Sequence, residues 1–125
     1  MTVRLTALLR RNPALSHEEF AAHWRDVHGP LMRSLPGIEQ RVLGYEQHPR
    51  AVAPGLWTGS EGVDGMAVQW FPRVDDLMAM IADPSYQEKI APDERHLLDL
   101  DRSLFVVTSE PRVVIEGNGD ARDGR

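Results

Sequence analysis

Cysteine is absent from the 125 residues of this chain. Without it the protein has no disulfide bonds, no thiolate nucleophile, no iron–sulfur cluster and no zinc site built from sulfur ligands. Long apolar runs are absent as well, because no stretch reaches the ~20 consecutive apolar residues of a membrane-spanning helix. We therefore expect a soluble, cytoplasmic protein with no membrane partner, whose chemistry depends on groups other than thiols.

Positive charge is scarce: 14 Lys and Arg residues stand against 19 Asp and Glu residues, for a formal net charge of −5. That sign disfavours a surface that neutralises phosphates, so we expect no nucleic-acid partner. The sequence also lacks glycine-rich nucleotide fingerprints, phosphate loops and nucleophile elbows, which leaves nucleotide cofactors and serine hydrolysis without support. Hydrophobic residues make up 42% of the chain, enough for the core of one domain.

The first third of the chain predicts a strand followed by a helix. Residues 3–9 alternate in the period of a strand with one face on the core. Ser16 and Glu19 have the spacing of a capping box, which predicts that a helix begins at Ser16. An apolar stripe then recurs at helical spacing: Phe20, Trp24, Val27 and Leu31. We expect Gly29-Pro30 to interrupt or bend this helix near its end.

The middle of the chain predicts two strands, a loop and a second helix. Strands are expected over residues 38–48 and 66–71, separated by a long loop over residues 50–62 that is rich in Pro, Gly, Ser and Thr. The second helix is expected over residues 74–81, and Asp83-Pro84 closes it. Its apolar stripe has the i, i+3, i+4, i+7 pattern: Val74, Leu77, Met78 and Ile81.

The last third predicts short helices, a strand and a tail. Residues 86–90 and 93–100 are expected to form two helical pieces divided by Pro92, and residues 104–115 form a fourth strand rich in Val and Phe. Residues 117–125 hold three glycines and no large apolar side chain, which predicts a disordered tail. The domain is therefore expected to span residues 1–116.

The order β-α-β-β-α-β is that of the ferredoxin-like, split βαβ arrangement. This is an α+β fold with one four-stranded antiparallel sheet and helices on one face. The other face of the sheet then presents several apolar side chains to water, and an exposed patch of that kind marks an interface. We expect a homodimer that closes two such sheets against each other.

Several segments together resemble a known family. They are the helical stretch FAAHWRDVHGPL at residues 20–31, Tyr45 with Gln47-His48, the segment DGMAVQWF at residues 64–71, Asp93-Glu94 with Asp99, and Glu110. This pattern resembles the EthD domain. The resemblance implies a dimeric α+β barrel, in which two ferredoxin-like protomers pair through their sheets and each encloses a small pocket between sheet and helices. Proteins with the wider fold include cofactor-free monooxygenases, isomerases, polyketide cyclases and haem enzymes, so the fold does not choose an activity.

Five histidines concentrate the candidate acid–base chemistry, because imidazole titrates near neutral pH without perturbation. His28 is the main catalytic candidate, since it lies at a helix end beside Gly29-Pro30 and matches the histidine of the family's H-G-P stretch. The alternative is that His28 bonds a backbone carbonyl and stabilises the helix C-terminus. His23, on the other side of the apolar stripe, is a candidate for substrate binding. His17 is expected at the surface.

Other candidates come from the strands. His48 ends the second strand, where it lies either at a pocket mouth or in solvent, and the Tyr45 phenol is placed to bond an enolate or carbonyl oxygen. Three aromatic residues either line a substrate pocket or belong to the core: Trp24, Trp70 and Phe71. His17 and His28 lie ~16 Å apart along a helix, too far to share one ion. We expect no metal and no cofactor.

These observations favour a small enzyme that acts on a hydrophobic, aromatic or polyketide-like molecule by cofactor-independent histidine chemistry. His28 would be the acid or base, with Tyr45 or His48 assisting. The reaction classes left open are isomerisation, dehydration, cyclisation and cofactor-free oxidation. The alternatives are an EthD-type oxidoreductase or auxiliary protein that needs a redox partner, and a non-catalytic binding module for a hydrophobic metabolite.

Overall fold

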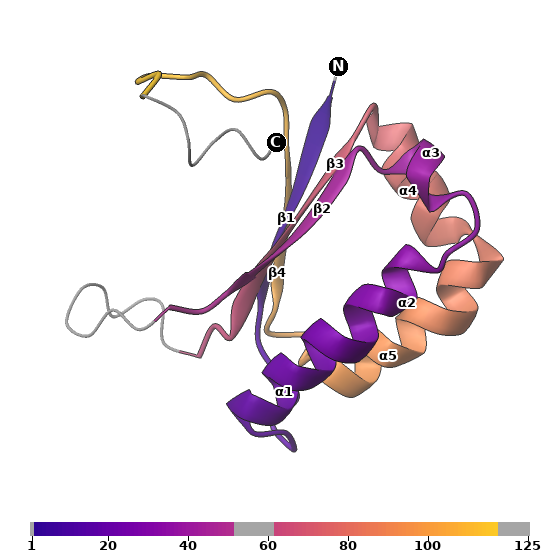
Figure 1. Cartoon of the computed structure of the whole chain (residues 1–125), viewed down its shortest axis with the longest axis vertical. Helices are drawn as coiled ribbons and strands as arrows, with labels where there is room; N and C mark the ends of the chain where they lie inside the picture. The colour runs from indigo at the N-terminus through magenta and orange to yellow at the C-terminus, as the bar shows by residue number, and fades with distance from the viewer. Residues whose placement is uncertain (1, 52–61, 118–125) are drawn as a thin grey trace.

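The structure, a computed structural model, describes residues 2–51 and 62–117. Its sheet contains four antiparallel strands in the order β2-β3-β1-β4. The strands are β1 (Val3–Leu9), β2 (Gly44–Pro49), β3 (Gly65–Phe71) and β4 (Leu104–Thr108). The helices all cover one face of this sheet (Figure 1). The chain therefore has the expected ferredoxin-like α+β fold.

The helical layer has two arms. The first contains α1 (His17–His23), η1 (Trp24–His28), α2 (Gly29–Arg33) and the short α3 (Ile38–Arg41). The second contains α4 (Val74–Ala82), η3 (Tyr86–Ile90) and α5 (Ala91–Leu97). The elements η1 and η3 are π-helical turns. Among the described residues, no helix is long and apolar enough to cross a membrane.

The first arm begins as predicted but continues past the expected break. Ser16 Oγ accepts from the Glu19 backbone N–H at 3.0 Å, and Glu19 Oε1 accepts from the Ser16 N–H at 2.8 Å, which confirms the capping box. The helix does not end at Gly29-Pro30. Instead the Gly29 N–H donates to the carbonyl of Trp24, five residues back, so the chain widens into a π turn and the helix then resumes.

This π turn moves the buried stripe by one position. An α-helix turns about 100° per residue, so side chains four residues apart are each rotated by about 40° around the helix relative to the one before. A π turn contains one extra residue, which removes much of this rotation. The buried residues of the arm have this spacing of four: Phe20, Trp24, His28 and Met32. Val27 is 41% exposed, so the predicted stripe was wrong at Val27, whereas Leu31 is partly buried and packs against the core. The same shift carries His28 to the inner face.

Three predicted boundaries were wrong for local reasons. Residues 38–41 are helical rather than extended, because Gly37 adopts a φ of +73° that starts a turn. Pro92 does not separate two helical pieces, because it occupies the first turn of α5, where no N–H is needed. The helix α5 ends at Leu97 rather than at residue 100. β4 ends at Thr108 rather than residue 115, shortly before Pro111, which has no N–H to donate to a ladder.

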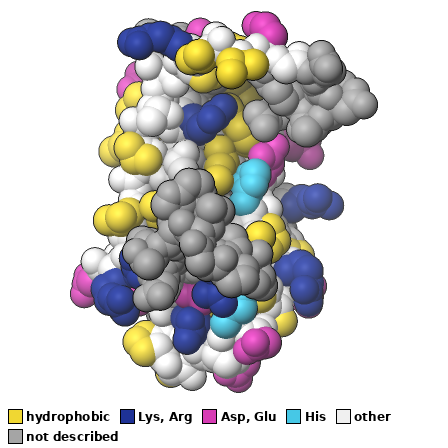
Figure 2. All heavy atoms as spheres, turned by 90° about the vertical axis from the view of Figure 1, so that its left-hand side faces the viewer, with side chains coloured by type: hydrophobic (Ala, Val, Ile, Leu, Met, Phe, Trp, Pro, Cys, Tyr) yellow, Lys and Arg dark blue, Asp and Glu magenta, His cyan; other side chains and the backbone are white. Residues whose placement is uncertain are grey.

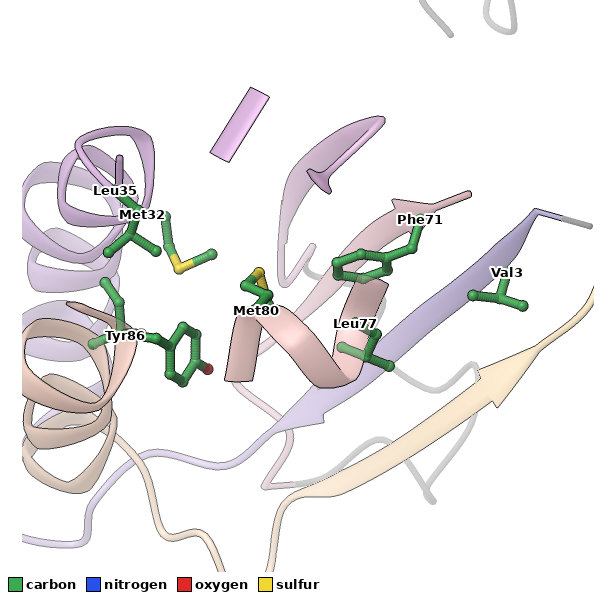
Figure 3. Packing of buried hydrophobic residues seen from close by; sticks show 8 residues of the cluster. Val3, Met32, Leu35, Phe71, Leu77, Met80 and Tyr86 are labelled. Carbon is green, nitrogen blue, oxygen red and sulfur yellow. The ribbon is translucent and has the colours of Figure 1, made fainter. Parts of the chain in front are cut away.

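The core lies between the sheet and the helices in two clusters. One gathers around Phe71, Leu77 and Met80, and Figure 3 shows Tyr86 projecting from the helical layer toward these residues. The other gathers around Phe20, Trp24 and Leu97. Leu77 and Met80 are the buried residues of α4, whereas Val74 and Met78 are largely exposed, so the predicted stripe of this helix was wrong at those two positions.

The opposite sheet face carries hydrophobic side chains mixed with charged ones (Figure 2). Leu104 and Val106 of β4 belong to this face by register, and they are 60% and 53% exposed. Most of the predicted loop over residues 50–62 lies outside the described residues. The same holds for almost all of the predicted tail over residues 117–125.

Candidate active site

A cavity of about 400 Å³ lies between the sheet and the two helical arms. This volume is within the usual range of small-molecule sites. Its lining is mostly apolar, with Leu5 and Ala7 of β1 on the sheet side and Leu77 and Met80 of α4 on the helix side. Six polar side chains also line it: His28, Tyr45, Gln69, Tyr86, Gln87 and Glu94.

His28 joins the cavity to a carboxylate behind it. Its side chain is 10% exposed, and its Nδ1 lies 2.8 Å from Oδ2 of Asp93, a residue of α5. An ionised carboxylate only accepts hydrogen bonds, so Nδ1 carries the proton and donates it. In the neutral imidazole, the other ring nitrogen, Nε2, then holds the lone pair. Asp93 thereby sets the tautomer and ring orientation of His28, an arrangement that suits a general base.

Asp93 bonds two imidazoles at once. His23 Nε2 lies 2.6 Å from its Oδ1, while His28 occupies Oδ2. Burial alone would raise the pKa of Asp93, but the hydrogen bonds and charges of the two histidines outweigh it and hold that pKa below its ordinary value. Asp93 is therefore ionised at neutral pH. His23 packs against His96, with ring centroids 5.0 Å apart, and does not line the cavity.

Glu94, the next residue, has the opposite electrostatic character. Its Oε2 accepts a hydrogen bond of 2.7 Å from the Tyr86 hydroxyl, and it lines the cavity together with His28. Burial raises the pKa of Glu94 in spite of the bond from Tyr86 and the attraction of His28. Two neighbouring carboxyl groups thus have pKa values shifted in opposite directions, an arrangement typical of acid–base sites.

Tyr45 and Gln69 are neighbours on adjacent strands and form the polar part of the sheet side. Gln47 Nε2 donates to the Tyr45 hydroxyl at 3.0 Å and to the Trp24 carbonyl at 2.9 Å, which ties β2 to the π turn η1. Burial raises the pKa of Tyr45, so its phenol stays neutral. Gln69 Oε1 is buried and has no hydrogen-bond partner among the described residues.

Trp24 lines the cavity, and its ring leaves no room for a side chain at the start of β3. A Cβ added at Gly65 would lie 2.7 Å from the Trp24 ring, well inside contact distance. Gly65 is therefore needed for the position of this ring. Tyr45 also lines a more open groove of about 960 Å³ on the α2 and β2 side of the molecule, so its ring is part of the wall between groove and cavity.

The other predicted site residues lie away from the cavity. Side chains of β2 alternate between the two faces of the sheet, which places His48 on the face opposite the cavity. Its Nε2 bonds Glu46 Oε1 at 2.8 Å. Trp70 is on the same outer face, beneath the Arg4 guanidinium at 5.2 Å. Phe71 points inward but belongs to the packed core. Of the predicted site residues, the structure brings His28, Tyr45 and Trp24 to the cavity.

Sequence reasoning did not assign roles to Asp93, Glu94, Tyr86 or Gln69. The pair Asp93-Glu94 entered only as part of the family-like pattern and as acidic residues in a first helical turn. Nothing local marks them as partners of a histidine 65 residues away. Within the described part of the chain, no group of three His, Cys, Asp or Glu side chains is arranged to hold a metal ion.

Two proteins of similar sequence are named as dehydratases. The chain is 26% identical over 129 aligned residues to the dehydratase aurZ of Gibberella zeae, covering 97% of this chain and 85% of that protein. It is 25% identical to the conidial pigment biosynthesis dehydratase EthD of Metarhizium robertsii, covering 82% of this chain and 78% of that protein.

Solved structures share the fold. A Bacillus halodurans protein described as a member of the EthD family superposes with a TM-score of 0.65 at 16% identity, over 89% of this chain and all of that one. A dimeric ferredoxin-like protein of unknown function from Thermobifida fusca has a TM-score of 0.61 at 18% identity, over 88% and 92%. The family model of the EthD domain matches residues 12–101. The chain belongs to the EthD domain family.

Proposed function

We propose that this protein is a small acid–base enzyme, a dehydratase that removes water from a hydrophobic hydroxy-carbonyl compound. The observation that carries the proposal is the pair of His28 and Asp93 at the wall of a mostly apolar cavity. An imidazole held in one tautomer by a buried carboxylate is the arrangement used for proton abstraction. No group outside the chain is required for such a step.

In this proposal the residues of the cavity have separate tasks. His28 Nε2 removes the proton from the carbon next to the substrate carbonyl, and Asp93 stabilises the imidazolium that forms. The neutral phenol of Tyr45 donates to the carbonyl oxygen as it gains negative charge. Gln69 Oε1, which has no partner among the described residues, accepts from a substrate hydroxyl. The apolar lining binds the rest of the substrate.

The names of the relatives support dehydration over the other reaction classes. Both curated relatives are called dehydratases, and one of them belongs to conidial pigment biosynthesis. By this analogy the substrate is an aromatic or polyketide-derived compound whose loss of water extends a conjugated system. Neither relative's name points to oxidation.

The test uses two model compounds and two histidine variants. The protein is assayed by absorbance for dehydration of 4-hydroxy-4-phenylbutan-2-one and for base-catalysed ring opening of 5-nitrobenzisoxazole. His28→Gln should lower both rates by roughly 10²–10⁴, because it removes the base. His17→Gln removes a histidine of the same helix outside the cavity and should leave both rates unchanged.

Each other outcome contradicts a part of the proposal. Equal turnover in His28→Gln and wild type would remove His28 from the mechanism. Binding of the hydroxy ketone without any turnover would favour the non-catalytic binding module. Turnover that stops when oxygen is removed would favour oxidation.

We also propose that two copies pair through their outer sheet faces. Leu104 and Val106 are exposed there, and similar folds from Bacteroides fragilis and Thermobifida fusca are described as dimeric. Light scattering should give about twice 14.1 kDa. Val106→Asp should produce monomers, whereas Val27→Asp, at a position on the helical side that is also exposed, should not. A monomeric wild type at micromolar concentration would overturn this pairing.

A further inference from the structure

The geometry points to Glu94 as a second catalytic residue, the general acid that protonates the leaving hydroxyl while His28 removes the proton from carbon. This inference rests on the proposed dehydration, because it names the group that completes that reaction. It gives the site two proton-transfer groups from two helical elements, one from η1 and one from α5.

Glu94 lies at the wall of the cavity. It lines the same cavity as His28, so both side chains reach one bound molecule. Tyr86 donates to Glu94 Oε2 at 2.7 Å, which fixes the carboxyl group. Among the described residues, Oε1 has no hydrogen-bond partner. A protonated carboxyl that accepts at Oε2 therefore keeps the proton on Oε1, where it is free to donate to a ligand.

The electrostatic surroundings favour the protonated form of Glu94 more than water does. The titratable groups around it are His28 on η1, Tyr86 on η3, Tyr45 on β2, and Asp93 and Arg95 on its own helix. Burial is the largest influence and raises the pKa of Glu94, and the nearby negative charge of Asp93 acts in the same direction. The attraction of His28 and Arg95 opposes this without reversing it.

The proposed reaction is balanced by this pair of residues. The Cα–H electron pair forms the new C=C bond as the proton moves to His28 Nε2. The Cβ–O bond breaks with its electron pair on oxygen, and the Glu94 proton joins that oxygen to release water. His28 is left as imidazolium and Glu94 as carboxylate, and a proton returns from the first to the second before the next turnover. No oxidant or reductant is needed.

The experiment separates the acid from the base. Dehydration of 4-hydroxy-4-phenylbutan-2-one needs both, because hydroxide is a poor leaving group. Ring opening of 5-nitrobenzisoxazole needs only the base, because its leaving oxygen becomes a stable phenolate. Glu94→Gln, which keeps the hydrogen bond from Tyr86, should lower the first rate by about 10²-fold or more and the second by less than about threefold. Glu88→Gln, at an exposed position of η3, is the matched control and should change neither.

The outcomes distinguish this inference from the proposed function. If Glu94→Gln dehydrates the hydroxy ketone at the wild-type rate while His28→Gln does not, the acid assignment is overturned and the base assignment stands. If wild type opens the benzisoxazole but never dehydrates the hydroxy ketone, both the dehydration and the acid assignment fail.

A measurement without turnover tests Glu94 itself. Infrared difference spectra between wild type and Glu94→Gln should contain the carbonyl stretch of one protonated carboxyl group. As pH is raised, that band should disappear, and the midpoint of its loss should lie above the ordinary pKa of glutamate, which is about 4.3. A midpoint at or below that value would overturn the assignment even if the protein is an active dehydratase.

Discussion

Two aspartates of this protein, Asp64 and the partly buried Asp93, each bond an imidazole, yet their surroundings differ. Asp64, 1% exposed, accepts from His17 Nδ1 at 2.8 Å and from Arg11 Nη1 at 2.9 Å. Its other oxygen accepts from the Arg11 backbone N–H at 2.9 Å. Asp93 has two imidazoles and no guanidinium. His17 was expected at the surface; this bond leaves its side chain partly buried, 26% exposed.

The two aspartates differ in the cationic group that bonds them and in whether their partners reach the cavity. The Arg11 guanidinium is permanently charged, so it neutralises Asp64 at any ordinary pH, and none of the cluster's members lines the cavity. This cluster ties the segments after β1 and before β3 to α1. Asp93 faces groups that gain and lose protons, and one of them opens to the cavity. A carboxylate–histidine pair is thus suited to catalysis only where its second ring nitrogen reaches a ligand.

The largest effect should come from Asp93→Asn. Without the carboxylate, His28 loses the partner that fixes its tautomer and stabilises its charged form, so dehydration of the hydroxy ketone should fall roughly 10²–10⁴-fold. Asp64→Asn should leave the rate per folded molecule within about twofold. Single-turnover rates normalised to the folded fraction check both expectations. Equal losses in the two variants would mean that the clusters have the same role.

Stability should respond in the reverse order. Asp64→Asn leaves Arg11 and His17 without their carboxylate in a site where the carboxyl is nearly inaccessible, so the free energy of unfolding should fall by about 2–4 kcal/mol. Asp93→Asn keeps one oxygen acceptor for its histidines and should cost about 1 kcal/mol. Denaturant titrations measure both. A larger loss in Asp93→Asn would make that cluster the main structural one.

The sequence predicted those parts of the fold that are determined locally. The alternation of β1 and the reciprocal bonds of Ser16 and Glu19 each involve residues within one element, so their pattern is visible in the sequence. The π turn η1 is different, because its Trp24 carbonyl accepts both from the Gly29 N–H and from Gln47 on β2. The bond from Gln47 is long-range, so it is invisible in a local pattern. The predicted stripe included Val27 because its spacing assumed a regular α-helix.

The candidate site shows the same division. His28 was identified as a site residue by its place in the family-like stretch, and the structure gives it a partner, Asp93, that lies 65 residues later in the chain. Periodicity cannot pair two positions on separate helices. Likewise, alternation places Tyr45 and His48 on opposite faces of β2, but it does not show which of the two faces the helices cover.

Gln69, unlike the Asp64 cluster, should lower the stability of the fold in order to bind the substrate. Its Oε1 is buried and lacks a partner among the described residues, and such an atom lowers stability. Gln69→Leu should therefore raise the free energy of unfolding by about 1 kcal/mol while weakening binding of the hydroxy ketone. Thermal melts and equilibrium titration measure the two effects. If the variant is less stable and binds equally well, Gln69 is an ordinary structural residue.

The smallest effect concerns acid. Burial alone would raise the pKa of Asp64, but its hydrogen bonds from Arg11 and His17 outweigh it and lower that pKa. A carboxyl group with a lowered pKa in the folded state contributes stability that is present above its unfolded pKa of about 4, and this stability is lost as pH falls through the folded value. One such group adds a slope of at most about 1.4 kcal/mol per pH unit.

Asp64→Asn should therefore be less stable than wild type at pH 7 but lose stability less steeply below pH about 4. Asp83 also has a lowered pKa, from the backbone N–H of Ser85 and from Arg41, and its contribution is the same in both proteins, so the difference between their curves isolates Asp64. Denaturant titrations at a series of acidic pH values measure that difference. If the two curves stay parallel down to acid unfolding, the carboxyl of Asp64 does not titrate differently in the folded and unfolded states. Its cluster would then stabilise the fold through hydrogen-bond geometry rather than through charge.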